Sequence, residues 1–197
     1  MKTIIKTVFT FIFILVITSC NSGEKKDTNT TTNTTTEKAS DSKEKGQAFI
    51  ADDGSTPNVL QIAIGSPDHT TLVAAVQAAD LENVLVNAGP LMVFAPTNDA
   101  FAALPEGTVE TLLKPENKNT LADILKYHVT PGNYSKDFLK KAFNGKELGQ
   151  ANNQYVLVEV KGDDVYVGGA KIIGSVNAGN GIVHVIDKVM LPATEKN

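Results

Sequence analysis

Imidazole serves both as a metal ligand and as a general base near neutral pH, so the three histidines are the first candidates for chemistry in this chain. They are His69, His128 and His184. No two of them have a ligand spacing such as H-x-x-x-H, and the chain has one cysteine, Cys20, so no second thiol can join it. We therefore expect no metal site and assign the three histidines to the core or to loops.

A hydrolase would need a nucleophile, a base and an orienting acid. The sequence has no G-x-S-x-G motif, and the carboxylate pairs Asp52-Asp53 and Asp163-Asp164 lie in turn-rich stretches typical of solvated loops. Gly168-Gly169 and Gly179-Asn180-Gly181 are not followed by a predicted helix, so neither stretch indicates a phosphate-binding loop. We expect no catalytic residues and no cofactor.

Cys20 follows a segment typical of export. The apolar run from Val8 to Ile17 comes after a basic start and is shorter than the roughly 20 residues of a membrane span. Ile17-Thr18-Ser19-Cys20 then resembles the bacterial lipobox, which directs acylation of its cysteine and cleavage before it. The resemblance implies a cleaved signal peptide over residues 1–19 and membrane anchoring through acyl chains such as palmitate on Cys20. A plain signal peptide with an incidental cysteine and a short membrane anchor are the alternatives.

Composition divides the rest of the chain into a tether and a domain. Residues 20–47 are rich in Thr, Asn, Ser, Lys and Glu, so no packed core can offset the entropy of ordering them. We expect one folded domain over residues 48–197, with its core over 58–192. All 18 basic residues are Lys, and removing residues 1–19 leaves 16 Lys against 22 acidic residues, so nucleic acid is a poor partner.

The apolar pattern of the domain predicts helices first and strands after, hence an α+β fold with a mostly antiparallel or mixed sheet. Helices are expected at 57–66, from Ser66 up to the stop at Gly89-Pro90, at 100–104, at 108–113 and around 121–128. Strands are expected at 91–95, 155–160, 164–167, 171–173 and 182–191, the longest, with turns at Gly162-Asp163 and Asn180-Gly181.

Three stretches resemble the signatures of the fasciclin (beta-Ig-H3/fasciclin) domain, an adhesion and matrix module found from bacteria to animals. They are LMVFAPTNDAF at Leu91–Phe101, LKYHV at Leu125–Val129 and NGIVHVIDKVMLP at Asn180–Pro192, and their order and spacing match as well. The similarity runs from about Val59 to Pro192. It implies a wedge of mixed or antiparallel β-sheet with several packed α-helices.

We assign the polar residues of these motifs mainly to scaffolding. Thr97 and Asn98 have side chains that accept hydrogen bonds from the free amides of a following turn, and His128 is expected to make a buried hydrogen bond. The full set of motif residues is Phe94, Ala95, Pro96, Thr97, Asn98, Phe101, Tyr127, His128, Asn180, Gly181, His184 and Asp187. Animal matrix members that engage integrins carry an acidic pentapeptide before the third stretch. The matching positions 173–177 contain no Asp, so integrin-like adhesion there is not expected.

The resemblance implies a non-catalytic, monomeric module in the cell envelope that contacts an unknown protein or polysaccharide in cell adhesion, extracellular matrix or biofilm contacts. Residues 133–153 are expected to form its variable, loop-rich surface. The alternative is a carrier of an apolar small molecule such as a pigment or lipid, because some relatives bind pigments, and a carrier should have a sizeable apolar pocket. The lipid anchor favours the outer membrane over the inner, with the domain facing the periplasm or exposed at the surface.

Replacing Cys20 by Ala is expected to leave an unacylated precursor that retains residues 1–19, because the thiol that receives the lipid is lost. Metabolic labelling with a fatty acid, with mass spectrometry of the amino terminus, measures both effects. Label that persists in Cys20→Ala would contradict the lipid-anchor prediction.

Overall fold

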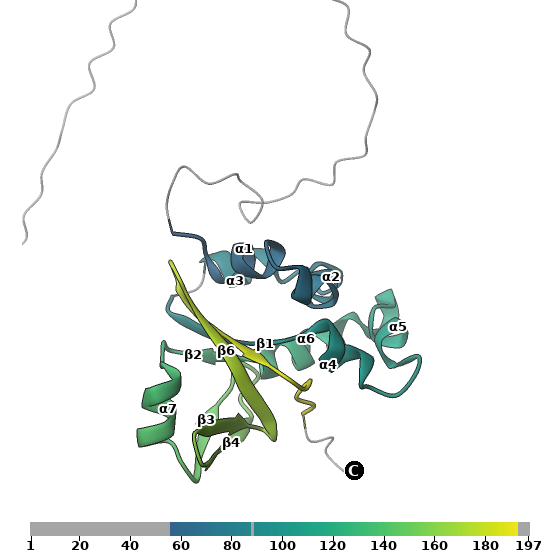
Figure 1. Cartoon of the computed structure of the whole chain (residues 1–197). Coiled ribbons are helices and arrows are strands. Elements are labelled where there is room, and N and C mark those ends of the chain that lie inside the picture. The colour runs from purple at the N-terminus through teal and green to yellow at the C-terminus, as the bar shows by residue number, and fades with distance from the viewer. Residues whose placement is uncertain (1–55, 88, 193–197) are drawn as a thin grey trace, which may run out of the picture. The chain divides into compact units, whose positions relative to one another are not determined.

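The computed structural model describes residues 56–87 and 89–192 (Figure 1). The expected signal peptide, Cys20, the whole expected tether and residues 48–55 of the expected domain lie outside the described residues. Within the two described ranges, the helices are too short or too polar to cross a membrane.

A seven-stranded sheet runs through the domain in the order β2-β1-β7-β6-β5-β4-β3. β1 and β7 pair in parallel, and the other neighbours are antiparallel. The predicted α+β class with a mixed sheet is confirmed. The strands are β1 (Leu91–Pro96), β2 (Val129–Pro131), β3 (Lys146–Gly149), β4 (Tyr155–Lys161), β5 (Asp164–Val167), β6 (Ala170–Ala178) and β7 (Gly181–Ile186).

Short helices precede and interrupt the strands. Asn58 begins the first of them with a capping box, because its Oδ1 accepts from the amide of Gln61 at 2.9 Å while Gln61 Oε1 accepts from the amide of Asn58 at 2.9 Å. The helices are α1 (Val59–Ile64), the 3₁₀ turn η2 (Pro67–His69), α2 (Thr70–Ala78), α3 (Glu82–Asn87), α4 (Asn98–Ala102), α5 (Thr108–Leu112), the 3₁₀ turn η3 (Pro115–Asn117), α6 (Lys118–Tyr127) and α7 (Lys136–Ala142).

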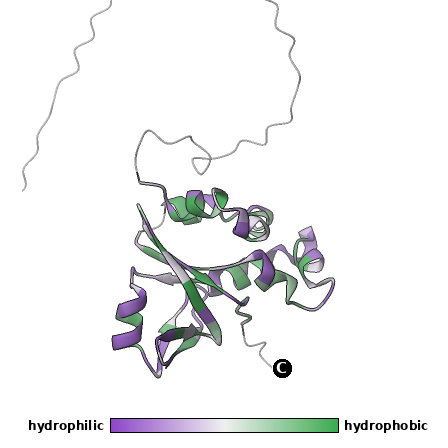
Figure 2. Cartoon of the chain, viewed as in Figure 1, coloured by the Kyte–Doolittle hydropathy of each residue, from purple (hydrophilic) through white to green (hydrophobic). Residues whose placement is uncertain are grey.

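β1 and β7 lie between two hydrophobic cores, because successive residues of a strand face opposite sides of the sheet. Met92 and Phe94 of β1 pack into a core with residues of β3 to β7 and α7. Leu91, Val93 and Ala95 face a second core with residues of α1, α2 and α6. Figure 1 shows α1, α2 and α3 on one side of β1, and α7 with β3 and β4 on the other. In Figure 2 hydrophobic colour is found on β1 and on the helices that pack on it, while α7 is largely hydrophilic.

The two edge strands of the sheet approach each other. The amide of Ala151, just after β3, donates to the carbonyl of Val129 in β2 at 2.7 Å. Beside it the buried side chains of Thr130 and Gln150 form a hydrogen bond of 3.1 Å. These contacts occupy backbone groups that an open sheet edge would offer to another chain. Both cores and all seven strands come from residues 59–190, so a polypeptide of residues 48–197 contains the whole folded unit.

The segment after Ser66 is not the single helix that its apolar spacing predicts. Asp80 has φ 53°, a left-handed conformation that an α-helix cannot continue, and it separates α2 from α3. The amide of Leu81 donates back to Val76 at 3.1 Å across this break. The residues are therefore helical on both sides of Asp80, but α2 and α3 are separate elements.

The second half of the domain also departs from the predicted pattern. α7 lies where loops were expected, and the Ser135 hydroxyl caps it by accepting from the amide of Phe138 at 3.2 Å. β2 and β3 were missed because strands of three and four residues show no clear alternation. β6 has nine residues and β7 has six, so β7 is not the longest strand. The turn before β7 is Gly179-Asn180, and Gly181 already belongs to the strand.

Gly181→Ala is expected to lower the free energy of unfolding by about 2 kcal/mol or more, because a Cβ at this position would overlap the carbonyl oxygen of Leu91 in β1. Urea unfolding of residues 48–197 measures the effect. Gly89→Ala is the matched control, since a Cβ there meets nothing within 4 Å. Equal stability of the two variants would show that β1 and β7 do not approach so closely.

Candidate functional site

The corner between β1 and α4 holds the first pair of motif residues. Thr97 Oγ1 caps α4 by accepting from the amide of Ala100 at 3.2 Å, as its position in the sequence predicts. Asn98 does not cap α4. Its Oδ1 accepts from the amide of Thr71 at 3.0 Å and its Nδ2 donates to the carbonyl of Pro67 at 2.9 Å, so Asn98 ties this corner to the start of α2.

His128 ends α6 and is 3% exposed. Its Nδ1 donates to the carbonyl of Ile124 at 2.8 Å, and its Nε2 accepts from the amide of Met190 at 2.9 Å. Because a carbonyl only accepts and an amide only donates, the ring carries one proton and is neutral. Burial away from water lowers the pKa of His128 from 6.5 to about 4. Both ring nitrogens are used inside the protein, which leaves neither for a ligand.

His184 is fully buried in β7. Its Nε2 donates to the carbonyl of Tyr134 at 2.9 Å, and its Nδ1 accepts from the Ser175 hydroxyl at 2.7 Å. The ring stacks on Phe94 with 5.8 Å between centroids, and burial lowers the pKa of His184. Sequence analysis missed Ser175 and Tyr134. A two-residue turn at Gly179-Asn180 would have predicted that Ser175 faces His184 across the hairpin.

Asn180 joins three elements at the other end of β7. Its Oδ1 accepts from the amide of Val59 at the start of α1 at 2.9 Å, and its Nδ2 donates to the carbonyl of Leu85 in α3 at 2.8 Å. Its own carbonyl accepts from the amide of Leu91, where β1 begins, at 3.0 Å. One side chain thus holds α1 and α3 at a set distance from the sheet.

The remaining motif residues also make internal contacts. Asp187 Oδ1 accepts from the amide of Lys171 at 2.8 Å and so joins β6 to the segment after β7. The hydroxyl of the buried Tyr127 lies 3.4 Å from the carbonyl of Tyr155. Phe101 is half-buried against the core beneath the helices, while Ala95 and Pro96 are buried at the end of β1.

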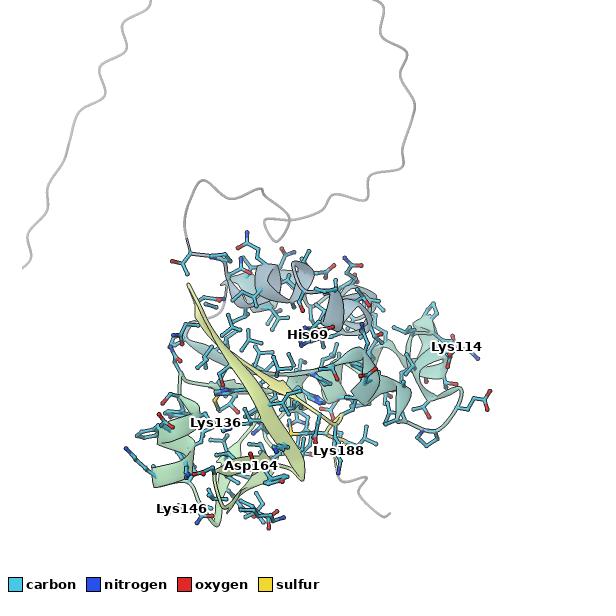
Figure 3. All side chains as sticks on the ribbon, in the orientation of Figure 1. His69, Lys114, Lys136, Lys146, Asp164 and Lys188 are labelled. Carbon is cyan, nitrogen blue, oxygen red and sulfur yellow. The ribbon has the colours of Figure 1, made fainter. Side chains whose placement is uncertain are left out.

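His69 is the histidine with an unsatisfied ring nitrogen. Its Nδ1 is 2.8 Å from the hydroxyl of Ser66, while its Nε2 is buried and has no hydrogen-bond partner among the described residues. Burial lowers the pKa of His69. Figure 3 shows it at the start of α2, on the inner side of the helix layer. Within the described ranges, no cluster of three His, Cys, Asp or Glu residues could hold a metal ion.

An apolar cavity of about 220 Å³ lies in the core beneath the helices. α1, α2 and α3 form its walls, β1 and Val183 of β7 lie against it, and the end of α6 closes it. Val84, Lys126 and Ala151 are exposed lining residues, with Val84 56% exposed, so the cavity is not fully enclosed. Sequence analysis predicted the helices and the strand around this space but gave no sign of the cavity, because an unfilled space depends on how separate elements meet.

Comparisons with known proteins agree on one family. A model of the fasciclin domain matches residues 67–192. Protein sll1483 of Synechocystis sp. is 47% identical over 139 residues, which cover 70% of this chain and 75% of that protein. Immunogenic protein MPB70 of Mycobacterium bovis is 35% identical over 140 residues, 68% of each chain.

The matches to animal proteins cover a smaller share of the matched protein. Transforming growth factor-beta-induced protein ig-h3 of Sus scrofa is 35% identical over 159 residues, which are 77% of this chain but 22% of that protein. A solved FAS1 domain pair from the insect cell adhesion molecule fasciclin I is 24% identical with a TM-score of 0.47, and the match covers 61% of this chain and 44% of the other.

The depressed pKa of His128 predicts a pH-dependent stability. The unfolded chain binds a proton near pH 6.5 and the folded chain only near pH 4, so His128 destabilises the fold progressively as the pH falls between these values. His128→Gln keeps one donor and one acceptor but does not titrate. The free energy of unfolding should fall from pH 7 to pH 4 in both proteins, and the fall should be about 3 kcal/mol smaller in His128→Gln than in the original.

Urea unfolding of residues 48–197 at both pH values measures the difference, and His128→Ala serves as the second variant. His128→Ala should cost about 1–3 kcal/mol at pH 7, because the carbonyl of Ile124 and the amide of Met190 lose their partner. The same pH-dependent loss in the original and in His128→Gln would contradict the assignment of a buried, neutral His128.

Proposed function

The chain belongs to the fasciclin-domain family, and on that premise we propose that it is a non-catalytic interaction module of the cell envelope. Fasciclin domains occur in adhesion-related proteins, and the matches indicate no catalytic family. In this proposal acyl chains on Cys20 hold the protein at the outer membrane, residues 20–47 act as a tether, and the monomeric domain of residues 48–197 contacts a protein or polysaccharide partner.

The internal hydrogen bonds of the motif residues support this proposal. Asn98, His128, Asn180 and His184 direct their side-chain polar atoms to other parts of the same domain. Groups that are already paired within the domain are poor contacts for a partner. Recognition is therefore left to the outer surface.

The outer face of β4 is the surface that best fits a partner, and it is the observation on which the proposal depends. Tyr155 is 66% exposed and Leu157 is 46% exposed, and both point away from the core because they are two residues apart on one strand. Exposed Tyr side chains are enriched in protein interfaces. Residues 133–153 were expected to form a loop surface, but they contain α7 and β3. We therefore place the candidate surface on β4, the strand that pairs with β3.

The double variant Tyr155→Ser and Leu157→Ser is expected to bind isolated envelope fractions about tenfold more weakly than the original domain, because two desolvated anchors are lost. Sedimentation of labelled residues 48–197 with these fractions measures the affinity. Ile64→Ser, which removes a 41% exposed apolar side chain from α1, is the matched control. Unchanged binding of the double variant, or equal loss with Ile64→Ser, would rule out the β4 face.

A second candidate function, a carrier for an apolar small molecule such as a pigment or lipid, is favoured by the cavity beneath α1, α2 and α3. Its volume of about 220 Å³ exceeds the roughly 150 Å³ of an engineered apolar cavity that binds benzene. It is smaller than the roughly 300 Å³ at which pockets for drug-sized ligands begin, which suits a slim ligand.

The carrier candidate is tested by extracting purified domain with organic solvent and identifying apolar molecules by mass spectrometry. Val73 of α2 lines the cavity and is only half-buried, so Val73→Phe should fill part of the space without unfolding the domain. An apolar molecule recovered from the original domain and absent from Val73→Phe would support a carrier. Equal recovery from both, or from neither, would exclude this cavity as its site.

A further inference from the structure

The cavity beneath the helices offers one polar group to a ligand. Among its lining residues Lys126 alone is charged, and it is exposed on α6. His128 also lines the cavity, but both of its ring nitrogens are bonded to backbone groups. The lining itself is almost wholly apolar, so Lys126 lines the cavity with the carbons of its side chain while its ammonium stays in water. This ammonium is the one charged group that the lining residues offer to the head of a ligand.

Lys126 is free to bind such a head. It takes part in none of the four ion pairs found among the described residues. Asp123, one turn earlier on α6, accepts instead from Asn152 Nδ2 at 3.4 Å. An unpaired cation beside an opening with apolar walls matches a ligand that is anionic at one end and apolar along the rest.

We propose that this cavity binds a single-chain amphiphile with a carboxylate head, a fatty-acid-like molecule whose chain lies between the helices and the sheet. The inference rests on the carrier function proposed above and names its ligand class. The carboxylate pairs with the exposed ammonium of Lys126, outside the apolar part of the cavity. One ammonium balances one carboxylate, whereas a phosphate monoester carries about −1.5 to −2 charges at neutral pH and would leave excess charge against the apolar rim.

The size and the anchoring of the walls favour a single chain. The volume of about 220 Å³ is below the roughly 300 Å³ at which pockets for drug-sized ligands begin, which is too small for a two-chain lipid. α1 and α3 are both hydrogen-bonded to Asn180, so these walls cannot separate widely without breaking those bonds. A short or medium acyl chain suits this space.

Decanoate and 1-decanol are matched probes, because they share the apolar chain and differ in the charged head. Titration calorimetry at pH 8 on delipidated residues 48–197 should give a dissociation constant for decanoate up to about fivefold lower than for decanol, the range of an exposed ion pair. Lys126→Gln should remove the preference and Lys126→Glu should reverse it. In 0.5 M salt the preference of the original domain should shrink, since exposed charges are screened.

Lys114→Gln is the control, since Lys114 is an exposed lysine that does not line the cavity and lies beside α5 at the edge of the molecule (Figure 3). This variant should keep the preference for decanoate. Equal affinity for the two probes in the original domain, or an unchanged preference in Lys126→Gln, would overturn the carboxylate inference and leave the carrier function standing. Binding of neither probe, or binding unaffected by Val73→Phe, would overturn the carrier function at this cavity itself.

Discussion

The parallel pairing of β1 with β7 is the constraint on which the rest of the domain depends. The two strands are more than 80 residues apart in sequence and pair along six residues, from Leu91 with Gly181 to Pro96 with Ile186. Both of their faces are buried, one against the helices and the other against the remaining strands and α7. A parallel pair covered on both faces needs apolar side chains throughout, which explains the nearly unbroken apolar sequence of β1.

Buried and half-buried polar side chains hold the outer elements to this central pair. The hydrogen bonds of His184 to Tyr134, His128 to Met190 and Asn180 to Val59 join residues 50, 62 and 121 positions apart. Each leaves an unpaired group that is at least partly buried if one partner is removed, so these bonds act as long-range constraints on the packing. The most recognisable residues of the domain therefore account for its fold, and the features open to a ligand or partner lie elsewhere.

Those open features follow from the same architecture. α1 and α3 have six residues each and cover β1 without filling the space above it, which leaves the apolar cavity with Lys126 at its opening. On the opposite side of the domain β4 buries Val156 and Val158 and turns Tyr155 and Leu157 outward. An interior site and an exterior surface can thus coexist in one small domain without sharing residues.

The sequence alone determined the features that depend on neighbouring residues. The strand β1, the cap at Thr97 and the hairpin around Gly162 were all predicted, because caps, turns and short apolar runs depend on residues close together in the chain. The tertiary structure decided the break at Asp80, the helix α7, the partners of Asn98 and His184, and the cavity. Each of these depends on which distant segments pack together, and hydrogen bonds or voids between distant segments have no local pattern.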